Sequence, residues 1–370
     1  WFALTATFSG SIATTAVGLA QYYVAPFLGP WFTEPLLAAG PLRVSALTLT
    51  AVGIIGLFTA INILGISFSA VVQSLVSYTP FAVLTVAAVY SLFAVKSGSM
   101  AASLSAASGG GGDSAGSIGL GHLGMAMLPV FFAYSGWNSA AYIGSEIKNA
   151  RRTLPLALIF GIGLIALLYL LLNSLFIHGA GIEGLRSMDN VGLLAAESGF
   201  GAAGKTAFTL LTGIAIMGSL NSTILIGPRI YYSMARDGLL FRTVGTLCPV
   251  RGTPRSGLLI QALWAAVLVH LGGFETILNY TTLMIVVLSG LTVGGVFLLR
   301  RKWPDRKAAF RVPLYPLIPA LYIAMSAFLV ITLCIENPRQ MAAAAMMVGF
   351  GMAAYRIFTR IDRRRRSAAF

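Results

Sequence analysis

Apolar segments of about 20 residues recur along the chain, and each is long enough to cross a lipid bilayer as one helix. Only 10% of the 370 residues are charged and 57% are hydrophobic, and the mean hydropathy is +0.84. Soluble domains carry about 25% charged residues. The sequence therefore predicts an all-α polytopic membrane protein that forms a single transmembrane domain over 1–370. The expected spans are 2–27, 44–66, 71–95, 123–145, 154–177, 205–235, 256–272, 275–300, 314–335 and 340–358.

Basic residues fall on alternate sides of these spans. If the stretch after 123–145 is cytoplasmic, that side collects all 25 Lys and Arg residues except Arg43, Lys96, Arg186, Lys205 and Arg339. This is the positive-inside pattern, and it accounts for the net charge of +14 without a nucleic-acid partner. We therefore expect an integral protein of the cell membrane with a cytoplasmic C-terminus.

Two segments outside the spans have distinct compositions. The stretch 97–119 is rich in Gly and Ser and predicts a flexible extracytoplasmic loop. The tail 359–370 is strongly basic. We expect it to be cytoplasmic, where it anchors the topology or also contacts anionic lipid headgroups.

The segment 131–138 is unusual inside a hydrophobic run, because it places Ser135, Gly136 and Asn138 where lipid favours apolar residues. A broken helix is tolerated at membrane depth only where the freed backbone is buried in protein or lines a polar cavity. In secondary transporters such breaks hold the substrate. The segment therefore predicts either a substrate-binding break or a kinked structural helix.

Other reactive residue types give no enzymatic pattern. Cys248 and Cys334 form no disulfide framework, and the three histidines have no metal-site spacing. Catalytic triads are not apparent, so we expect neither an enzyme nor a bound cofactor. The chain opens with Trp1 inside a hydrophobic run, and we interpret it as the interior of a longer protein.

Several motifs occur in a characteristic order along the chain. They are Gly136-Trp137-Asn138, the stretch 146–155, the stretch 218–239, Gly252-Thr253-Pro254, the stretch 298–304 and the stretch 310–316. Together they resemble the amino acid permeases of the amino acid–polyamine–organocation (APC) superfamily, near its L-type amino acid transporter branch. The resemblance covers nearly the whole chain.

This resemblance implies a LeuT-like fold of twelve helices, with two inverted five-helix repeats and two additional helices. The ten spans then correspond to family helices three to twelve. The family's first helix carries a Gly-Ser-Gly type break that holds the substrate backbone, and residues 1–29 contain no such motif. We therefore expect the chain to be truncated at its N-terminus.

The implied function is secondary active transport of amino acids by alternating access around residues 133–138. Ser135 has no neighbouring carboxylate to pair with a cationic side chain, so neutral substrates are expected. The alternative is a non-transporting membrane sensor or scaffold that retains the permease fold. An intact Gly-rich break upstream would favour transport.

Two further expectations concern coupling and partners. Pro80 stands where proton-coupled relatives carry a lysine, so we expect exchange of amino acids or a proton route elsewhere. The loop between Gly29 and Arg43 has no cysteine. We therefore expect no disulfide-linked heavy chain.

The resemblance also assigns roles to individual residues. Phe132 corresponds to the aromatic gate over the substrate, and Thr14, Thr15 and Gly18 could line the pocket or merely allow close helix packing. Glu146 and Arg229 are candidates for an ion pair in an inner gate. The proposed substrate-binding set is Phe132, Ala133, Ser135, Gly136, Asn138, Asn221 and Thr223. Asn138 has the alternative role of bracing the bent helix by hydrogen bonds, and Asn221 and Thr223 have the alternative role of hydrogen bonding between helices.

Overall fold

The computed structural model describes residues 1–39, 42–94, 119–142, 144, 147–187, 191–304, 310 and 312–336, with separate positions from 338 to 359. Glu146 lies outside the described residues. The predicted loop 97–119 and the tail 359–370 lie outside them almost entirely, and the predicted span 340–358 lies partly outside them.

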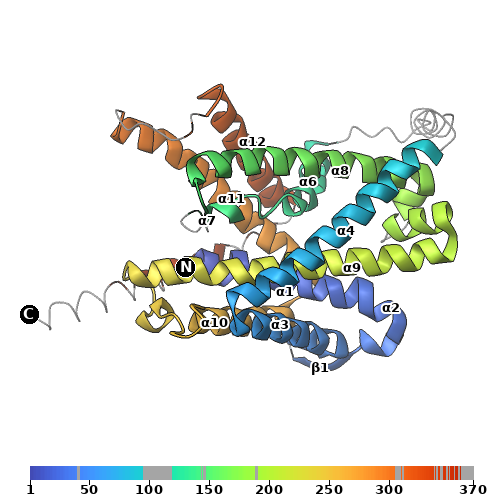
Figure 1. The fold of residues 1–370 in the computed structure, drawn as a ribbon, viewed down its shortest axis with the longest axis horizontal. Coiled ribbons are helices and arrows are strands. Elements are labelled where there is room, and N and C mark those ends of the chain that lie inside the picture. Colours follow the sequence, from blue (N-terminus) through green and yellow to red (C-terminus); the bar gives the residue numbers. More distant parts are fainter. Residues whose placement is uncertain are drawn as a thin grey trace, which may run out of the picture.

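The described chain is a bundle of long helices with one short hairpin (Figure 1). The first span contains π-helical and α-helical turns. These are η1 (Ala3–Phe8), α1 (Ser9–Leu19), η2 (Ala20–Val24) and α2 (Ala25–Leu28). The hairpin elements are η3 (Pro30–Phe32), β1 (Pro35–Ala39) and β2 (Leu42–Ser45). The two strands pair antiparallel, with Pro35 opposite Ser45 and Ala39 opposite Leu42.

The remaining elements are helical. They are α3 (Ala46–Leu64), α4 (Ile66–Ala94), α6 (Leu120–Ala133), α7 (Ser139–Tyr142), α8 (Ala150–Ser187), α9 (Val191–Arg236), η5 (Arg242–Gly245), α10 (Arg255–Leu271), α11 (Phe274–Lys302) and α12 (Leu317–Glu336). Within α9, the backbone is non-helical at Gly201, where φ is 68°.

The helix lengths confirm an all-α polytopic membrane protein. In the described part, seven helical stretches are long and apolar enough to cross a membrane, and α6 and α10 are shorter apolar helices. Together these account for every predicted span up to 314–335. The predicted boundary between the second and third spans is also present, because α3 ends at Leu64 and Gly65 adopts a φ of 138°.

The first span is the centre of the bundle. In the most apolar stretch of this span, 72% is buried inside the bundle. The corresponding value for the span Ala150–Ile177 is 6%, so that span lies at the surface of the bundle. Buried residues of α1, such as Ile12 and Ala16, pack in one cluster with Ile55 of α3, Ile224 of α9 and Ala265 of α10. Small side chains along α1 allow these neighbouring helices to approach closely.

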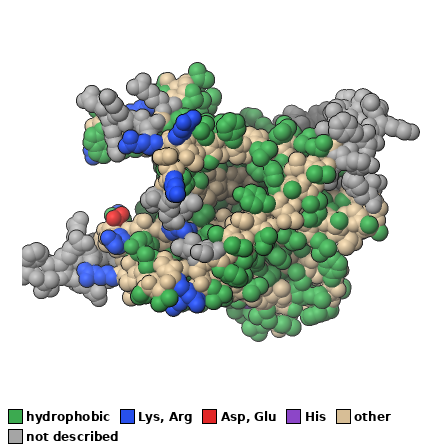
Figure 2. Space-filling model, viewed as in Figure 1, with side chains coloured by type: hydrophobic (Ala, Val, Ile, Leu, Met, Phe, Trp, Pro, Cys, Tyr) green, Lys and Arg blue, Asp and Glu red, His purple; other side chains and the backbone are tan. Residues whose placement is uncertain are grey.

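Basic side chains gather at one end of the bundle. The C-terminal ends of α9 and α11 lie toward the same side of the molecule (Figure 1). Figure 2 shows the visible Lys and Arg side chains collected there, while hydrophobic side chains cover much of the remaining surface. The alternation of charge along the sequence thus corresponds to a separation of charge in space.

Candidate functional site

The helix predicted to break does so at the expected residues. Helix α6 ends at Ala133, residues 134–138 form turns, and α7 begins at Ser139. Gly136 adopts a φ of 86°, in the left-handed region that glycine enters without steric cost. The amide of Ser135 donates to the carbonyl of Phe132 at 2.9 Å, which tightens the end of α6.

The break exposes backbone hydrogen-bonding groups. The amides of Gly136, Trp137 and Asn138 have no partner among the described residues. The surrounding turn is braced, because the Tyr169 hydroxyl donates to the Ala133 carbonyl at 3.0 Å. The side-chain amide of Asn138 donates to the Tyr142 hydroxyl at 2.8 Å. These amides form a small group of donors of the kind that can bind an anionic ligand group.

A cavity lies beside the last turn of α6. Its volume is about 420 Å³, within the range of small-molecule sites. The first span, α6, α9 and α11 all contribute to its walls. The described lining residues are Thr14, Thr15, Gly18, Tyr22, Tyr23, Phe132, Ile216, Ser219 and Phe274. We call this space the inner cavity.

One polar atom of the inner cavity lacks a partner. The hydroxyl oxygen of Thr14 is fully buried, and it makes no hydrogen bond to any described residue. A buried hydroxyl without a partner costs free energy, and a bound polar ligand would remove that cost. None of the described lining residues is Asp, Glu, Lys, Arg or His, so the described wall provides hydroxyls and aromatic rings.

The structure brings only part of the predicted site together. Phe132 lines the inner cavity alongside Thr14, Thr15 and Gly18 from the first span. The remaining predicted binding residues are not among its described lining residues. These are Ala133, Ser135, Gly136, Asn138, Asn221 and Thr223.

Asn221 instead belongs to a buried polar network between three helices. Its Nδ2 donates to Oε1 of Gln73 on α4 at 2.8 Å, and its Oδ1 accepts from Nδ2 of Asn62 on α3 at 2.8 Å. Ser69 donates to Oδ1 of Asn62 at 2.7 Å. Thr223 donates to the Ser219 carbonyl on its own helix at 2.9 Å. Asn221 therefore forms hydrogen bonds between helices, which was the alternative to its predicted contact with the substrate.

The predicted inner ion pair is described on one side only, because Glu146 lies outside the described residues. Arg229 donates to the Leu225 carbonyl at 3.2 Å. It lines a small cavity together with Asn62, Tyr232 and Thr253.

Five residues of the inner cavity were not predicted from the sequence. They are Tyr22, Tyr23, Ile216, Ser219 and Phe274. Tyr22 and Tyr23 follow Gln21 in an otherwise apolar run, and this polar interruption was a usable signal. Ser219 lies within the motif 218–239, one helical turn before Thr223. Phe274 carries no local signal, because its position depends on a contact with a helix more than 250 residues away in sequence.

Known proteins share this sequence pattern. A family model for amino acid permeases matches residues 1–355. The serine/threonine exchanger SteT of Bacillus subtilis is 30% identical over 210 residues, covering 56% of this chain and 48% of that protein. The human cystine/glutamate transporter is 25% identical over 235 residues, covering 64% and 46%. The human Asc-type amino acid transporter 1 is 28% identical over 235 residues, covering 63% and 44%.

The long apolar helices describe a helical membrane protein, and the family whose model matches is one of permeases, which are transporters and not enzymes. The chain belongs to the amino acid permease family. It spans about half the length of the curated relatives it matches.

Proposed function

We propose that the protein transports neutral amino acids across the cell membrane by alternating access around the break at residues 133–138. The observation that carries this proposal is the inner cavity beside the break. The unpartnered Thr14 hydroxyl supports it by offering a hydrogen bond to a polar ligand. The unpaired amides of 136–138 favour a carboxylate, because N–H groups and half-helix dipoles stabilise negative charge.

The choice of neutral side chains rests on the chemistry of the cavity wall. Its described residues contain no carboxylate. A Lys or Arg side chain entering it would lose its hydration without gaining a counter-ion, which is strongly unfavourable. Relatives include a serine/threonine exchanger, and substrates of that size fit the same reasoning.

The orientation and the coupling are part of the proposal. The end of the bundle that carries the visible basic side chains would be cytoplasmic by the positive-inside rule.

For the coupling of transport, we propose exchange of one amino acid for another, with a proton route elsewhere as the competing scheme. Buried Pro80 supports this, because it puts no titratable group at that position of α4.

Uptake into proteoliposomes containing the full-length protein tests the proposal. A panel of unlabelled amino acids should compete with labelled threonine, and Leu, Ala or Ser should compete better than Arg. Preloading with threonine should stimulate uptake more than an imposed pH gradient does. Preference for Arg would exclude the neutral cavity, and strict dependence on the pH gradient would exclude exchange. Absence of uptake for every amino acid would exclude transport.

A further inference from the structure

A β-hairpin covers part of the bundle's end opposite to the basic side chains. It connects the first span to α3 and consists of η3, β1 and β2. Phe32 of η3 is buried in the hydrophobic cluster around α1. Ser45 caps α3 by accepting from the Thr48 amide at 3.2 Å. The His270 ring Nδ1, on the last turn of α10, donates to the Arg43 carbonyl at 3.0 Å. The hairpin is therefore held to the bundle at three points.

The described part of one hairpin face is apolar and largely exposed. The strand register pairs Leu37 with Val44 and Ala39 with Leu42. Directly paired residues, and residues two apart along a strand, share a face. Leu37 is 57% exposed and Leu42 is 37% exposed. A contiguous exposed apolar surface marks a site of interaction with a protein or a membrane.

This apolar face continues onto surfaces that contact lipid. Trp31 of η3 is exposed, and so are Leu49 and Leu57 of α3. Because α3 is long and apolar enough to cross the membrane, its exposed apolar side chains face lipid. Tryptophan is enriched at the boundary between lipid and water. Figure 2 shows hydrophobic side chains gathered over the part of the molecule where Figure 1 places α3 and β1.

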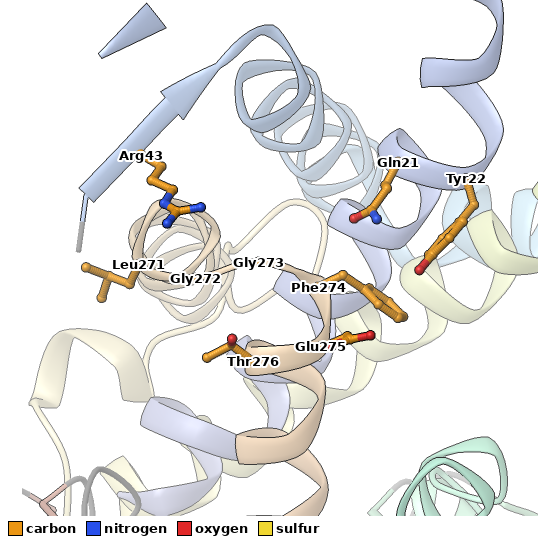
Figure 3. Close-up of a pocket in the computed structure, with 9 residues that line it drawn as sticks. All are labelled: Gln21, Tyr22, Arg43, Leu271, Gly272, Gly273, Phe274, Glu275 and Thr276. Atoms are coloured by element: carbon orange, nitrogen blue, oxygen red, sulfur yellow. The ribbon is translucent and has the colours of Figure 1, made fainter. Parts of the chain in front are cut away.

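The length of α10 sets the level of the hairpin in the membrane. Strand β2 packs against α3 and α10, and Figure 3 shows Arg43 beside Leu271 at the end of α10, where both line a pocket of about 460 Å³. The 17 residues of α10 rise about 26 Å, less than the hydrocarbon core of about 30 Å. Because α10 begins at the basic residue Arg255, which belongs at the inner boundary, its other end reaches no farther than the outer boundary.

The backbone of β1 limits how deep the hairpin can lie. Among the described residues β1 pairs only with β2, so its other edge presents unpaired amides and carbonyls. Open sheet edges do not occur in the hydrocarbon region, because nothing there replaces the missing hydrogen bonds. At the headgroup level, water and polar headgroups can bond to this edge while Leu37 and Leu42 reach the acyl chains.

We propose that the hairpin face formed by Leu37, Ala39, Leu42 and Val44 lies on the boundary between headgroups and acyl chains, in the leaflet away from the basic end. Phospholipid covers this face, and neither a second copy of the chain nor another protein does. The hairpin then completes the short crossing of α10 at the membrane surface. The proposal concerns the position of the protein in the bilayer and does not depend on transport.

Fluorescence of a nitrobenzoxadiazole (NBD) label in nanodiscs tests the proposal. Leu37→Cys is made in full-length protein whose other cysteines are replaced by Ser, then labelled and placed in phosphatidylcholine–phosphatidylglycerol nanodiscs. The quenchers are aqueous iodide, a phospholipid spin-labelled near its headgroup and one spin-labelled near the end of its acyl chain. Val250→Cys is the aqueous control, because Val250 is 89% exposed in the turn before α10. Leu164→Cys is the deep control, because Leu164 is exposed near the middle of the span Ala150–Ile177.

NBD at Leu37→Cys should emit at a shorter wavelength than NBD at Val250→Cys, because the boundary is less polar than water. The headgroup-labelled lipid should quench it about twofold more than either other quencher, as expected for a group at the interface. At Leu164→Cys the chain-end label should quench most. Leu42→Asp, added to Leu37→Cys, should weaken the lipid quenching, because it puts a charge on the same face. Ala38→Asp is the matched control, because Ala38 pairs with Arg43 on the opposite face, and it should leave the quenching unchanged.

Three results would overturn the proposal. Emission like that of Val250→Cys with strong iodide quenching would place the hairpin in water. Short-wavelength emission that neither lipid label quenches would mean that a second copy or another protein covers the face. Stronger quenching by the chain-end label than by the headgroup label would place the hairpin in the hydrocarbon core.

Discussion

The ring of Phe274 packs directly on the Cα of Gly18: a Cβ at position 18 would lie 2.8 Å from Cε2 of Phe274. Because real Cβ atoms do not approach a ring atom so closely, glycine is what permits this contact. The contact places Phe274 against Tyr22, and both rings line the inner cavity.

Gly18→Ala should therefore displace the Phe274 ring. Overpacking of this kind costs roughly 1–3 kcal/mol, and we expect uptake to fall about tenfold. Gly18→Ala combined with Phe274→Leu should recover part of the loss, because the smaller side chain leaves room for the methyl group. Gly53→Ala is the control, since a Cβ there meets nothing within 4 Å. An unchanged uptake rate for Gly18→Ala would show that the contact does not control access.

Gly136→Leu should abolish uptake without preventing membrane insertion. The left-handed backbone at Gly136, with φ of 86°, costs a residue with a Cβ roughly 1–2 kcal/mol, and a leucine favours continuous helix through the break. Gly163→Leu provides the comparison, because Gly163 lies inside the regular helix α8 with open space beside it. Near-normal uptake by Gly136→Leu would mean that the break is structural.

Asn221→Ala should destabilise the bundle and leave any residual substrate specificity unchanged. The substitution removes two side-chain hydrogen bonds and leaves the buried Asn62 and the half-buried Gln73 each with an unsatisfied group. For the buried Asn62 this costs about 1–3 kcal/mol. The melting temperature of the purified protein should fall. Thr223→Val should have a smaller effect, because that hydroxyl donates only to a carbonyl of its own helix. Equal melting temperatures for the two variants would contradict the network's role.

Cys248 should react readily with thiol reagents below the pH that an ordinary cysteine requires. Hydrogen bonds from the backbone of Arg251 and Val250 lower the pKa of its thiol, and the charges of Arg255 and Arg251 contribute further. A lower pKa raises the thiolate fraction at any pH below it, so the alkylation profile shifts toward acid. The measurement is the rate of labelling against pH in a Cys334→Ser background, with a short cysteine peptide as reference.

The same labelling tests the orientation. If the basic end is cytoplasmic, an impermeant reagent should label Cys248 in inside-out vesicles and spare it in right-side-out vesicles. Labelling in right-side-out vesicles would reverse the proposed topology.

Much of the fold was predictable because the bilayer imposes lengths and polarity on the sequence. The apolar spans, the break at 134–138 and the turn at Gly65 all follow from local composition. The cavity was only partly predictable. Phe132 and Thr14 were identified, whereas Phe274 reaches the cavity through a contact with Gly18 that no local pattern records. The direction of Asn221 likewise depends on which helix lies opposite it.

The amides of Asn62, Gln73 and Asn221 join α3, α4 and α9 at one level of the bundle. Sliding any of these helices past the others would break short hydrogen bonds made by the buried Asn62 and Asn221 and the half-buried Gln73. We therefore expect the three helices to translate and rotate as a unit during a transport cycle. We then expect α6 and α7 to move relative to these three helices, because the helical hydrogen bonding is interrupted between Ala133 and Ser139.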